Sequence, residues 1–155
     1  MKINYIHGNL MDSPYPILHG CNASGVAFAS GVAGHIRKIF PYAYQAYINA
    51  PKPLQMGGVI EASDPLGKGP LILNGITQNK YGTDKSIVYA DYDAIRSVIR
   101  KANDILFWTE FTNISLPLIG AGLANGSWKI ISEIIEEYSV FTPNVYLLDG
   151  LIPNT

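Results

Sequence analysis

Two stretches of small residues could bind an anionic ligand through their backbone. The first runs from Gly20 to Gly34 and the second from Gly120 to Gly126. A backbone without large side chains lets a ligand approach its amides closely, and the first amides of a following helix have no partner within that helix. Their dipole favours a diphosphate. The same composition is also typical of turns that need small residues only for tight packing.

Neither loop carries the motif of the common nucleotide-binding classes. No Gly-Lys-Ser or Gly-Lys-Thr closes either loop, so neither is a Walker A sequence. Neither matches GxGxxG with a downstream acidic residue, which disfavours a redox Rossmann domain. The first loop has no Lys or Arg before Arg37. Backbone amides would therefore have to carry most of the phosphate recognition.

His19 stands directly before the first loop and is the candidate catalytic residue. An imidazole near a phosphate could act as an acid or as a nucleophile. The alternative is a histidine packed at the end of a strand and satisfied by the backbone. Cys21 is flanked by small residues without an evident base, so we interpret it as a small buried packing residue.

The elements that must position these loops alternate between strand and helix patterns. Pro41 should break or bend the first helix because it lacks an amide donor. Ser127 is the expected N-cap of the last helix, which should end near Pro143. The expected strands cover residues 3–7, 16–19, 57–62, 70–76, 114–119 and 145–148, and the expected helices begin at residue 31, around residue 94 and after residue 127.

This alternation predicts an α/β fold with a largely parallel sheet covered by helices. Ligands bind at the carboxyl ends of the strands in such folds, and both small-residue loops follow strands. The two loops could wrap one extended ligand if their strands are neighbours. We expect the 155 residues to form a single domain, spanning 1–155, because no repeat or linker divides them.

Composition excludes several other classes. The net charge of −1 argues against a broad nucleic-acid-binding surface. A single cysteine rules out an internal disulfide framework, and the histidines lack the paired spacing of a structural zinc site. No apolar stretch approaches the length of a membrane span, and Met1 to Leu10 lacks the apolar region of a signal peptide. We therefore expect a cytoplasmic protein that has no membrane partner.

Several motifs together resemble a macro domain, and they cover essentially the whole chain in the expected order. They are Asn22–Gly25, Ser30–Ala33, Phe40–Tyr47, Leu116–Leu123 and Trp128. Thr77–Gln78, Tyr81–Gly82 and Asp91–Ile95 resemble the branch of that family that processes ADP-ribose 1″-phosphate, which bacteria and phages often encode. His19 to Asn22 resembles the His-x-Cys-Asn motif of the yeast phosphatase in this branch.

The resemblance implies a three-layer α/β/α fold with a mixed, largely parallel sheet and an ADP-ribose cleft across the strand ends. Asn9 stands where many relatives have an aspartate that accepts from the adenine amino group, so adenine selectivity is expected to be weaker or to rest on the backbone of Leu10. Phe28 lies in a link one residue longer than in many relatives, where it could cap the distal ribose or pack. The residues expected to bind the ligand are Asn9, Leu10, Asn22, Ser24, Gly25, Phe28, Ser30, Gly31, Val32, Ala33, Ile119, Gly120, Ala121, Gly122, Leu123 and Ala124.

The activity implied by the resemblance is hydrolysis of ADP-ribose 1″-phosphate to ADP-ribose, without a cofactor or metal. The alternatives are a non-catalytic reader of ADP-ribose and a hydrolase that removes ADP-ribose from modified macromolecules. Gln78 and Ala124 stand where a glycohydrolase branch carries a lysine and an aspartate, which disfavours that mechanism. Asp84 and Asp91 could be ligands, although solvated loop and cap positions suit them better. The expected partners are ADP-ribose or its derivatives and ADP-ribosylated macromolecules.

Overall fold

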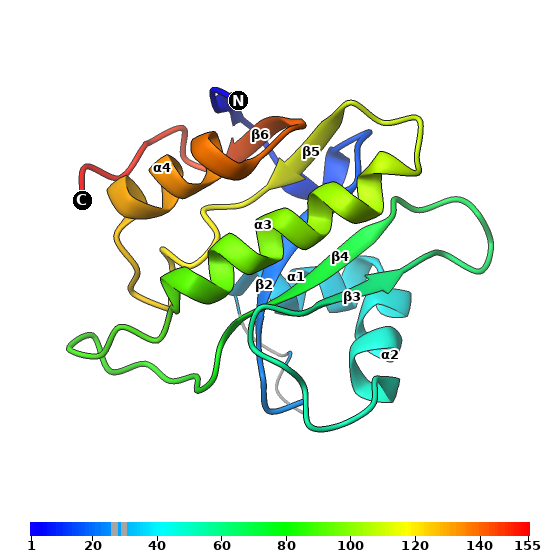
Figure 1. Ribbon diagram of the computed structural model, residues 1–155, viewed down its shortest axis with the longest axis horizontal. Helices are drawn as coiled ribbons and strands as arrows, with labels where there is room; N and C mark the ends of the chain where they lie inside the picture. The colour runs from blue at the N-terminus through cyan, green and yellow to red at the C-terminus, as the bar shows by residue number, and fades with distance from the viewer. Residues whose placement is uncertain (26–27, 29–30) are drawn as a thin grey trace.

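A mixed six-stranded sheet forms the centre of the structure (Figure 1). The computed structural model describes residues 1–25, 28 and 31–155. The strand order is β1-β6-β5-β2-β4-β3, and every neighbouring pair is parallel except β3 and β4. The strands are β1 (Asn4–His7), β2 (Ile17–Asn22), β3 (Val59–Ala62), β4 (Ile72–Gln78), β5 (Asn113–Leu116) and β6 (Thr142–Leu147).

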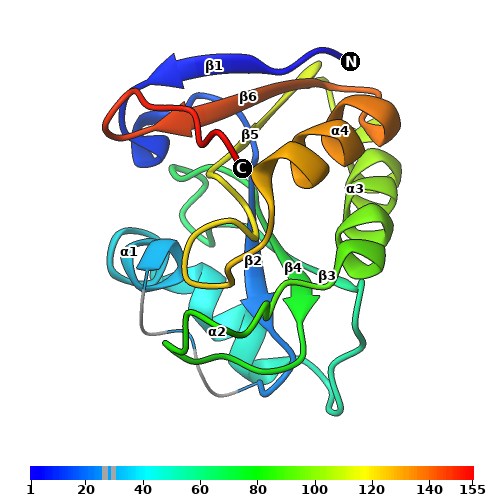
Figure 2. The ribbon, with the colours of Figure 1, turned by 90° about the vertical axis from the view of Figure 1, so that its left-hand side faces the viewer.

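Helices cover both faces of this sheet, which confirms the expected three-layer α/β/α fold. Seen along the sheet, α1 and α2 lie on one side, and α3 and α4 lie on the other (Figure 2). A short 3-10 helix, η1, follows β1. The bounds are η1 (Leu10–Asp12), α1 (Gly31–Ile39), α2 (Pro41–Asn49), α3 (Tyr92–Phe107) and α4 (Trp128–Tyr138).

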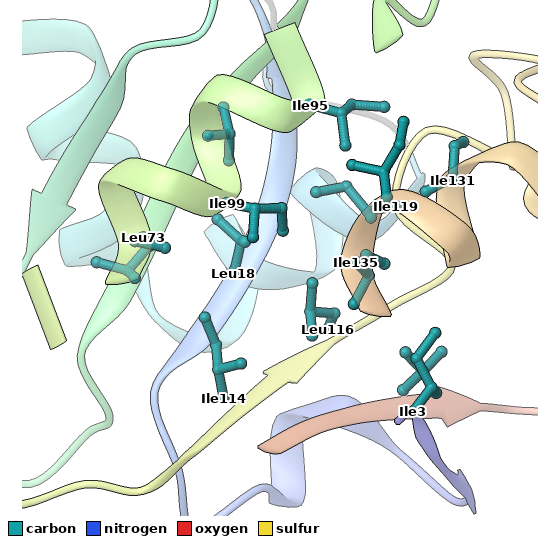
Figure 3. Packing of buried hydrophobic residues seen from close by; sticks show 14 of the residues in the cluster. Ile3, Leu18, Leu73, Ile95, Ile99, Ile114, Leu116, Ile119, Ile131 and Ile135 are labelled. Atoms are coloured by element: carbon teal, nitrogen blue, oxygen red, sulfur yellow. The ribbon is translucent and has the colours of Figure 1, made fainter. Parts of the chain in front are cut away.

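Each helical layer has its own apolar core. The larger core packs α3 and α4 against the sheet, where Ile99 of α3 and Ile135 of α4 meet Leu116 of β5 (Figure 3). The helix α3 can approach β4 closely because Gly75 lacks a side chain: a Cβ there would lie 2.6 Å from Cγ1 of Val98. The second core lies between the sheet and α1 and α2.

Pro41 separates the first helical stretch into two helices, as expected. It occupies the first turn of α2, where its missing amide has no acceptor to satisfy. Phe40 precedes it with φ −126° and ψ 71°, outside the helical region. The chain therefore turns between α1 and α2, and α2 directs the buried side chain of Tyr47 toward the sheet.

The largest differences between the expected and observed strand bounds are three residues each, at the ends of β2 and β5 and at the start of β6. β2 continues to Asn22 instead of ending at residue 19, and β5 ends at Leu116, directly before Pro117. Pro143 lies inside β6 rather than after α4. The amide of Thr142 donates to Thr112 beside β5, so the nitrogen of Pro143 faces the β1 side. Pairing with β1 begins only at Asn144, and no amide donor is needed at Pro143.

The ends of α3 and α4 follow their capping residues. Asp91 caps α3 by accepting from the amide of Ala94 at 3.0 Å, which confirms the cap alternative for this aspartate. Ser127 caps α4 as expected, through the amide of Ile130. None of the described helices is both long and apolar enough to cross a lipid bilayer.

Candidate functional site

The two small-residue loops meet at one edge of the sheet. Their strands, β2 and β5, are parallel neighbours paired through Ile17 and Ser115, so their carboxyl ends point the same way. The helix α1 begins at Gly31, within the first small-residue stretch, and directs the positive end of its dipole toward this edge. The condition for one ligand to contact both loops is therefore met.

A cavity of about 790 Å³, the main cavity, opens between these loops. Its lining comes from the end of β2, the start of α1, the end of β4 with the loop that follows it, and the loop after β5. The lining residues are Gly20, Cys21, Asn22, Phe28, Gly31, Val32, Ala33, Thr77, Gln78, Tyr81, Gly82, Thr83, Pro117, Leu118, Ile119, Gly120, Gly122, Leu123 and Ala124.

A second cavity of about 300 Å³, the edge cavity, adjoins the first at the β1–β6 side of the sheet. The two cavities share Val32, Pro117, Leu118 and Gly122, so they adjoin, and together they are called the groove. The other residues that line the edge cavity are Gly8, Asn9, Leu10, Met11, His35, Tyr146, Leu147, Leu148 and Asp149.

Asn22 is held in a fixed turn at the end of β2. Its Oδ1 accepts from the amide of Ser24 at 2.9 Å. The hydroxyl of Tyr47 lies 2.6 Å from the backbone oxygen of Asn22 and 3.2 Å from Oδ1, and it accepts from the amide of Gly25 at 3.0 Å. Tyr47 is fully buried, so a rigid part of the core fixes the turn that forms this end of the main cavity.

An irregularity in the β2–β4 pairing shapes the floor beside Asn22. Cys21 pairs with Ile76, whereas Asn22 pairs with Gln78, so Thr77 is the extra residue of a bulge. Bulges of this kind redirect side chains where a sheet ends. Thr77 and Gln78 both line the main cavity as a result. Gly20 is required next to them, because a Cβ there would lie 2.6 Å from Oγ1 of Thr77.

The loop between β4 and α3 forms the wall opposite α1 and is tied to the second small-residue loop. Asn125 has a positive φ of 60°, and its Nδ2 donates to the carbonyls of Asp84 at 3.1 Å and Ile87 at 2.7 Å. The carbonyl of Ala124 accepts from the amides of Tyr89 and Ala90. The two loops therefore form one connected wall, which carries Tyr81 to Thr83 into the lining.

His19 lies in the core and lines neither cavity, which favours the alternative of a histidine packed within a strand. Its side chain is 0% exposed, and Nε2 lies 2.6 Å from Oδ1 of Asn74. Asn74 donates its own amide to the carbonyl of Ala43, so its oxygen accepts and His19 is the donor. Burial lowers the pKa of His19 to about 4, against the opposing effect of the hydrogen bond to Asn74. The ring is therefore a neutral member of a buried network.

Phe28 and Cys21 line the main cavity from positions that are mostly buried. Phe28 is 1% exposed, and its ring packs against His19, Tyr44 and Tyr47 with centroid distances of 5.3, 5.6 and 5.0 Å. The structure thus favours packing over capping for this residue. Cys21 is buried as expected, and burial raises the pKa of its thiol above the ordinary value.

Most of the expected ligand-binding residues lie along this groove. Asn9 and Leu10 line the edge cavity, and ten others line the main cavity. Ser24, Gly25 and Ala121 stand outside the two linings, and Ser30 lies outside the described residues. Several further residues line the groove although the sequence did not mark them as ligand-binding, including Thr83, His35 and Asp149. No motif marks these residues, since they reach the groove only through the loop after β4, the exposed side of α1 and the end of β6.

The charge of the lining bears on its chemistry. Among the described residues of the two linings there is no Lys or Arg, so backbone amides and neutral side chains must bind any phosphate. The main cavity lining holds no carboxylate or histidine among these residues. No group of three or more His, Cys, Asp or Glu residues in the described chain could hold a metal ion. Asp84 and Asp91 are absent from both linings.

The chain is similar over most of its length to proteins that act on ADP-ribose derivatives, although no family model matches it. An ADP-ribose 1″-phosphate phosphatase of Meyerozyma guilliermondii is 27% identical over 177 residues, covering 95% of this chain and 99% of that protein. A DNA ADP-ribosyl glycohydrolase of Thermus aquaticus is 25% identical over 139 residues. That match covers 87% of this chain, which spans only 37% of the glycohydrolase.

Solved structures share the architecture. The macrodomain of Thermus aquaticus DarG matches with a TM-score of 0.74 at 23% identity, over 94% of this chain and 97% of that one. Thermosipho africanus DarTG in complex with ADP-ribose matches with a TM-score of 0.79 at 18% identity, over 99% of this chain and 43% of that one. The fold and the groove define an α/β/α domain with two adjoining cavities at the carboxyl edge of a largely parallel sheet. The chain therefore has the fold of a macro domain.

Proposed function

We propose that this chain, as a single domain, binds ADP-ribose along the groove and hydrolyses ADP-ribose 1″-phosphate to ADP-ribose. The observation that carries the proposal is the groove formed by the adjoining edge cavity and main cavity. The 27% identical relative, which matches along its whole length, is described as an ADP-ribose 1″-phosphate phosphatase. The DarTG structure with a similar fold is a complex with ADP-ribose.

The groove suits the parts of this ligand in order. The edge cavity has apolar walls that suit a flat purine ring, including Leu10, Val32 and Leu148. The shared Gly122 and the start of α1 present backbone to the middle of the groove, where the diphosphate would lie. The polar groups of Asn22 and Gln78 suit the distal ribose in the main cavity.

The lining limits how hydrolysis can proceed. Water must attack the phosphorus of the 1″-phosphate while the bond from phosphorus to the ribose oxygen breaks and that oxygen takes a proton. With neither carboxylate nor histidine among the described residues of the main cavity, the chain supplies neutral groups that hold the phosphate and orient the water. The phosphate of the substrate is then the strongest base near the attacking water. Because no side chain of the described main cavity lining acts as a general base, turnover should be slow.

The same observation favours a second candidate, a reader that binds ADP-ribose without changing it. A lining of neutral groups binds the ligand equally well without chemistry. Removal of ADP-ribose from DNA is a third activity, named for the Thermus aquaticus relative. ADP-ribosylated macromolecules are the partners that both alternatives imply.

One set of assays separates these functions. Calorimetry with ADP-ribose should give micromolar affinity, roughly −7 to −9 kcal/mol. Release of inorganic phosphate from ADP-ribose 1″-phosphate should accompany binding and should exceed release of ADP-ribose from modified DNA or protein. Binding without any release would favour the reader, and no binding at millimolar ADP-ribose would refute the proposal.

A further inference from the structure

The edge cavity holds few groups that can read a base. Its polar side chains among the described residues are Asn9, His35, Tyr146 and Asp149, and Asp149 is the only carboxylate of that lining. The remaining lining is backbone and apolar side chains. Apart from backbone groups, the choice between an amino group and a carbonyl on the base therefore depends on this small set.

The cap of η1 fixes how Asn9 is oriented. Its Oδ1 accepts from the amide of Met11 at 3.0 Å. That bond occupies one lone pair of Oδ1 and holds this oxygen toward η1, whereas Nδ2 can only donate to a ligand. An amino group on a base is itself a donor, so it requires a different acceptor.

Asp149 stands where that acceptor is needed. His7 of β1 pairs with Leu147 of β6, and the amide of Gly8 donates to the carbonyl of Leu147 at 3.0 Å. Asn9 lies two residues after His7, and Asp149 lies two residues after Leu147. The two chain segments therefore leave the sheet side by side. Oδ1 of Asp149 accepts from the amide of Leu151 at 2.9 Å, which fixes the carboxylate and leaves Oδ2 to accept from a ligand.

We infer that Asp149 determines base selectivity in the edge cavity. Oδ2 of Asp149 accepts from the amino group of adenine, and Nδ2 of Asn9 donates to a ring nitrogen of the same base. A base with a carbonyl in place of the amino group would set two acceptors against each other at Asp149 and bind more weakly. This inference rests on the proposed function, because it requires ADP-ribose in the groove.

The test compares ADP-ribose with inosine diphosphate ribose, in which a carbonyl replaces the adenine amino group. The wild-type chain should prefer ADP-ribose by about tenfold in Kd. Asp149→Asn keeps an oxygen for the amide of Leu151 but gains a donor, so it should lose or reverse this preference. Asp104→Asn, on the exposed side of α3, is the matched control and should keep it.

A swap of the two side chains gives a second readout. Asn9→Asp keeps the oxygen that accepts from the amide of Met11 and adds a second acceptor for the base. The double variant Asn9→Asp, Asp149→Asn should therefore restore the preference for ADP-ribose. Wild-type selectivity in Asp149→Asn would overturn the inference and leave the proposed function standing. If the wild-type chain bound neither nucleotide, both the inference and the proposed function would fail.

Discussion

At the residue scale, Tyr47 controls the geometry of the main cavity without lining it. Its hydroxyl is bonded to both ends of the turn from Asn22 to Gly25. Tyr47→Phe keeps the ring that packs against Phe28 but removes these bonds. We expect ADP-ribose affinity to fall about tenfold, because the turn loses its fixed position, with a loss of about 1–2 kcal/mol in stability.

Calorimetry and thermal unfolding would measure the two effects of Tyr47→Phe. Tyr44→Phe is the matched control on the same helix, since the ring of Tyr44 also packs against Phe28. Among the described residues, the hydrogen bonds of the turn from Asn22 to Gly25 involve the hydroxyl of Tyr47 and not that of Tyr44. Tyr44→Phe should leave affinity near the wild-type value. Equal losses of affinity in both variants would show that packing in α2, and not the hydroxyl of Tyr47, positions Asn22.

We expect His19 to affect how the free energy of unfolding depends on pH, and not how turnover depends on pH. The pKa of His19 is about 4 in the fold, against 6.5 in the unfolded chain. Between these values the unfolded chain binds the proton and the folded chain does not, so the free energy of unfolding falls as pH is lowered through this window. The loss across the window is about 3 kcal/mol.

Urea unfolding at pH 7.5 and pH 4.5 would measure this dependence. His19→Gln keeps a side-chain donor for Asn74 but does not titrate, so the difference in stability between the two pH values should shrink. His35→Gln, on the exposed side of α1, is the control that should change it little. A His19→Gln variant as sensitive to pH as wild type would show that other groups dominate acid sensitivity.

The sequence predicted the position of the groove residues better than that of His19. Asn22 and Gly122 were expected in the groove and both line it, because their motifs lie at or just after the carboxyl ends of strands. His19 was expected at the end of a strand, whereas β2 runs three residues further to Asn22. That extension puts His19 in the buried middle of the sheet. Strand length depends on pairing with β4 and β5, which a local pattern does not contain.

At the element scale, the second small-residue loop connects the two cavities. Gly122 lines both, and a Cβ there would meet nothing within 4 Å. Gly122→Glu should therefore fold normally while its carboxylate fills the phosphate path and repels the anion. We expect ADP-ribose affinity to fall by at least about a hundredfold, with little change in thermal stability.

Gly122→Ala separates the effect of bulk and charge from that of backbone freedom. A methyl group projects into open space, so this variant should retain affinity within a few fold of wild type. Wild-type affinity in Gly122→Glu would mean that the loop after β5 does not border the bound ligand.

Sequence patterns located the elements but not all of their limits. Pro41 and the caps at Asp91 and Ser127 act within one turn of helix, and each was placed correctly. Pro143 was expected to stop a helix, yet it lies in β6. A proline fits there only because β1 begins pairing one residue later, and that arrangement is set by strands far apart in the sequence.

At the scale of the whole molecule, the order of the strands produces the groove. β1 and β6 bring Asn9 and Asp149 to the edge cavity, while β2, β4 and β5 end around the main cavity. The alternation of elements predicted the layers and the carboxyl edge. It could not predict that β6 lies between β1 and β5, which places the end of the chain beside the first loop after β1.

This arrangement predicts how parts of the ligand bind. AMP should occupy the edge cavity and ribose 5-phosphate the main cavity, each with an affinity at least about a hundredfold weaker than that of ADP-ribose. The reason is that a linked ligand loses its translational and rotational freedom once, whereas two fragments lose it twice. Calorimetry with each fragment, alone and in the presence of the other, would measure both affinities and show whether the fragments bind together.

The Gly122→Glu variant provides the control for this experiment. Because Gly122 lines both cavities, its substitution should weaken both fragments, whereas Asp149→Asn should weaken AMP and leave ribose 5-phosphate unchanged. AMP binding as tightly as ADP-ribose would show that the main cavity contributes no affinity. Mutually exclusive fragments would place both in one cavity and contradict an extended ligand along the groove.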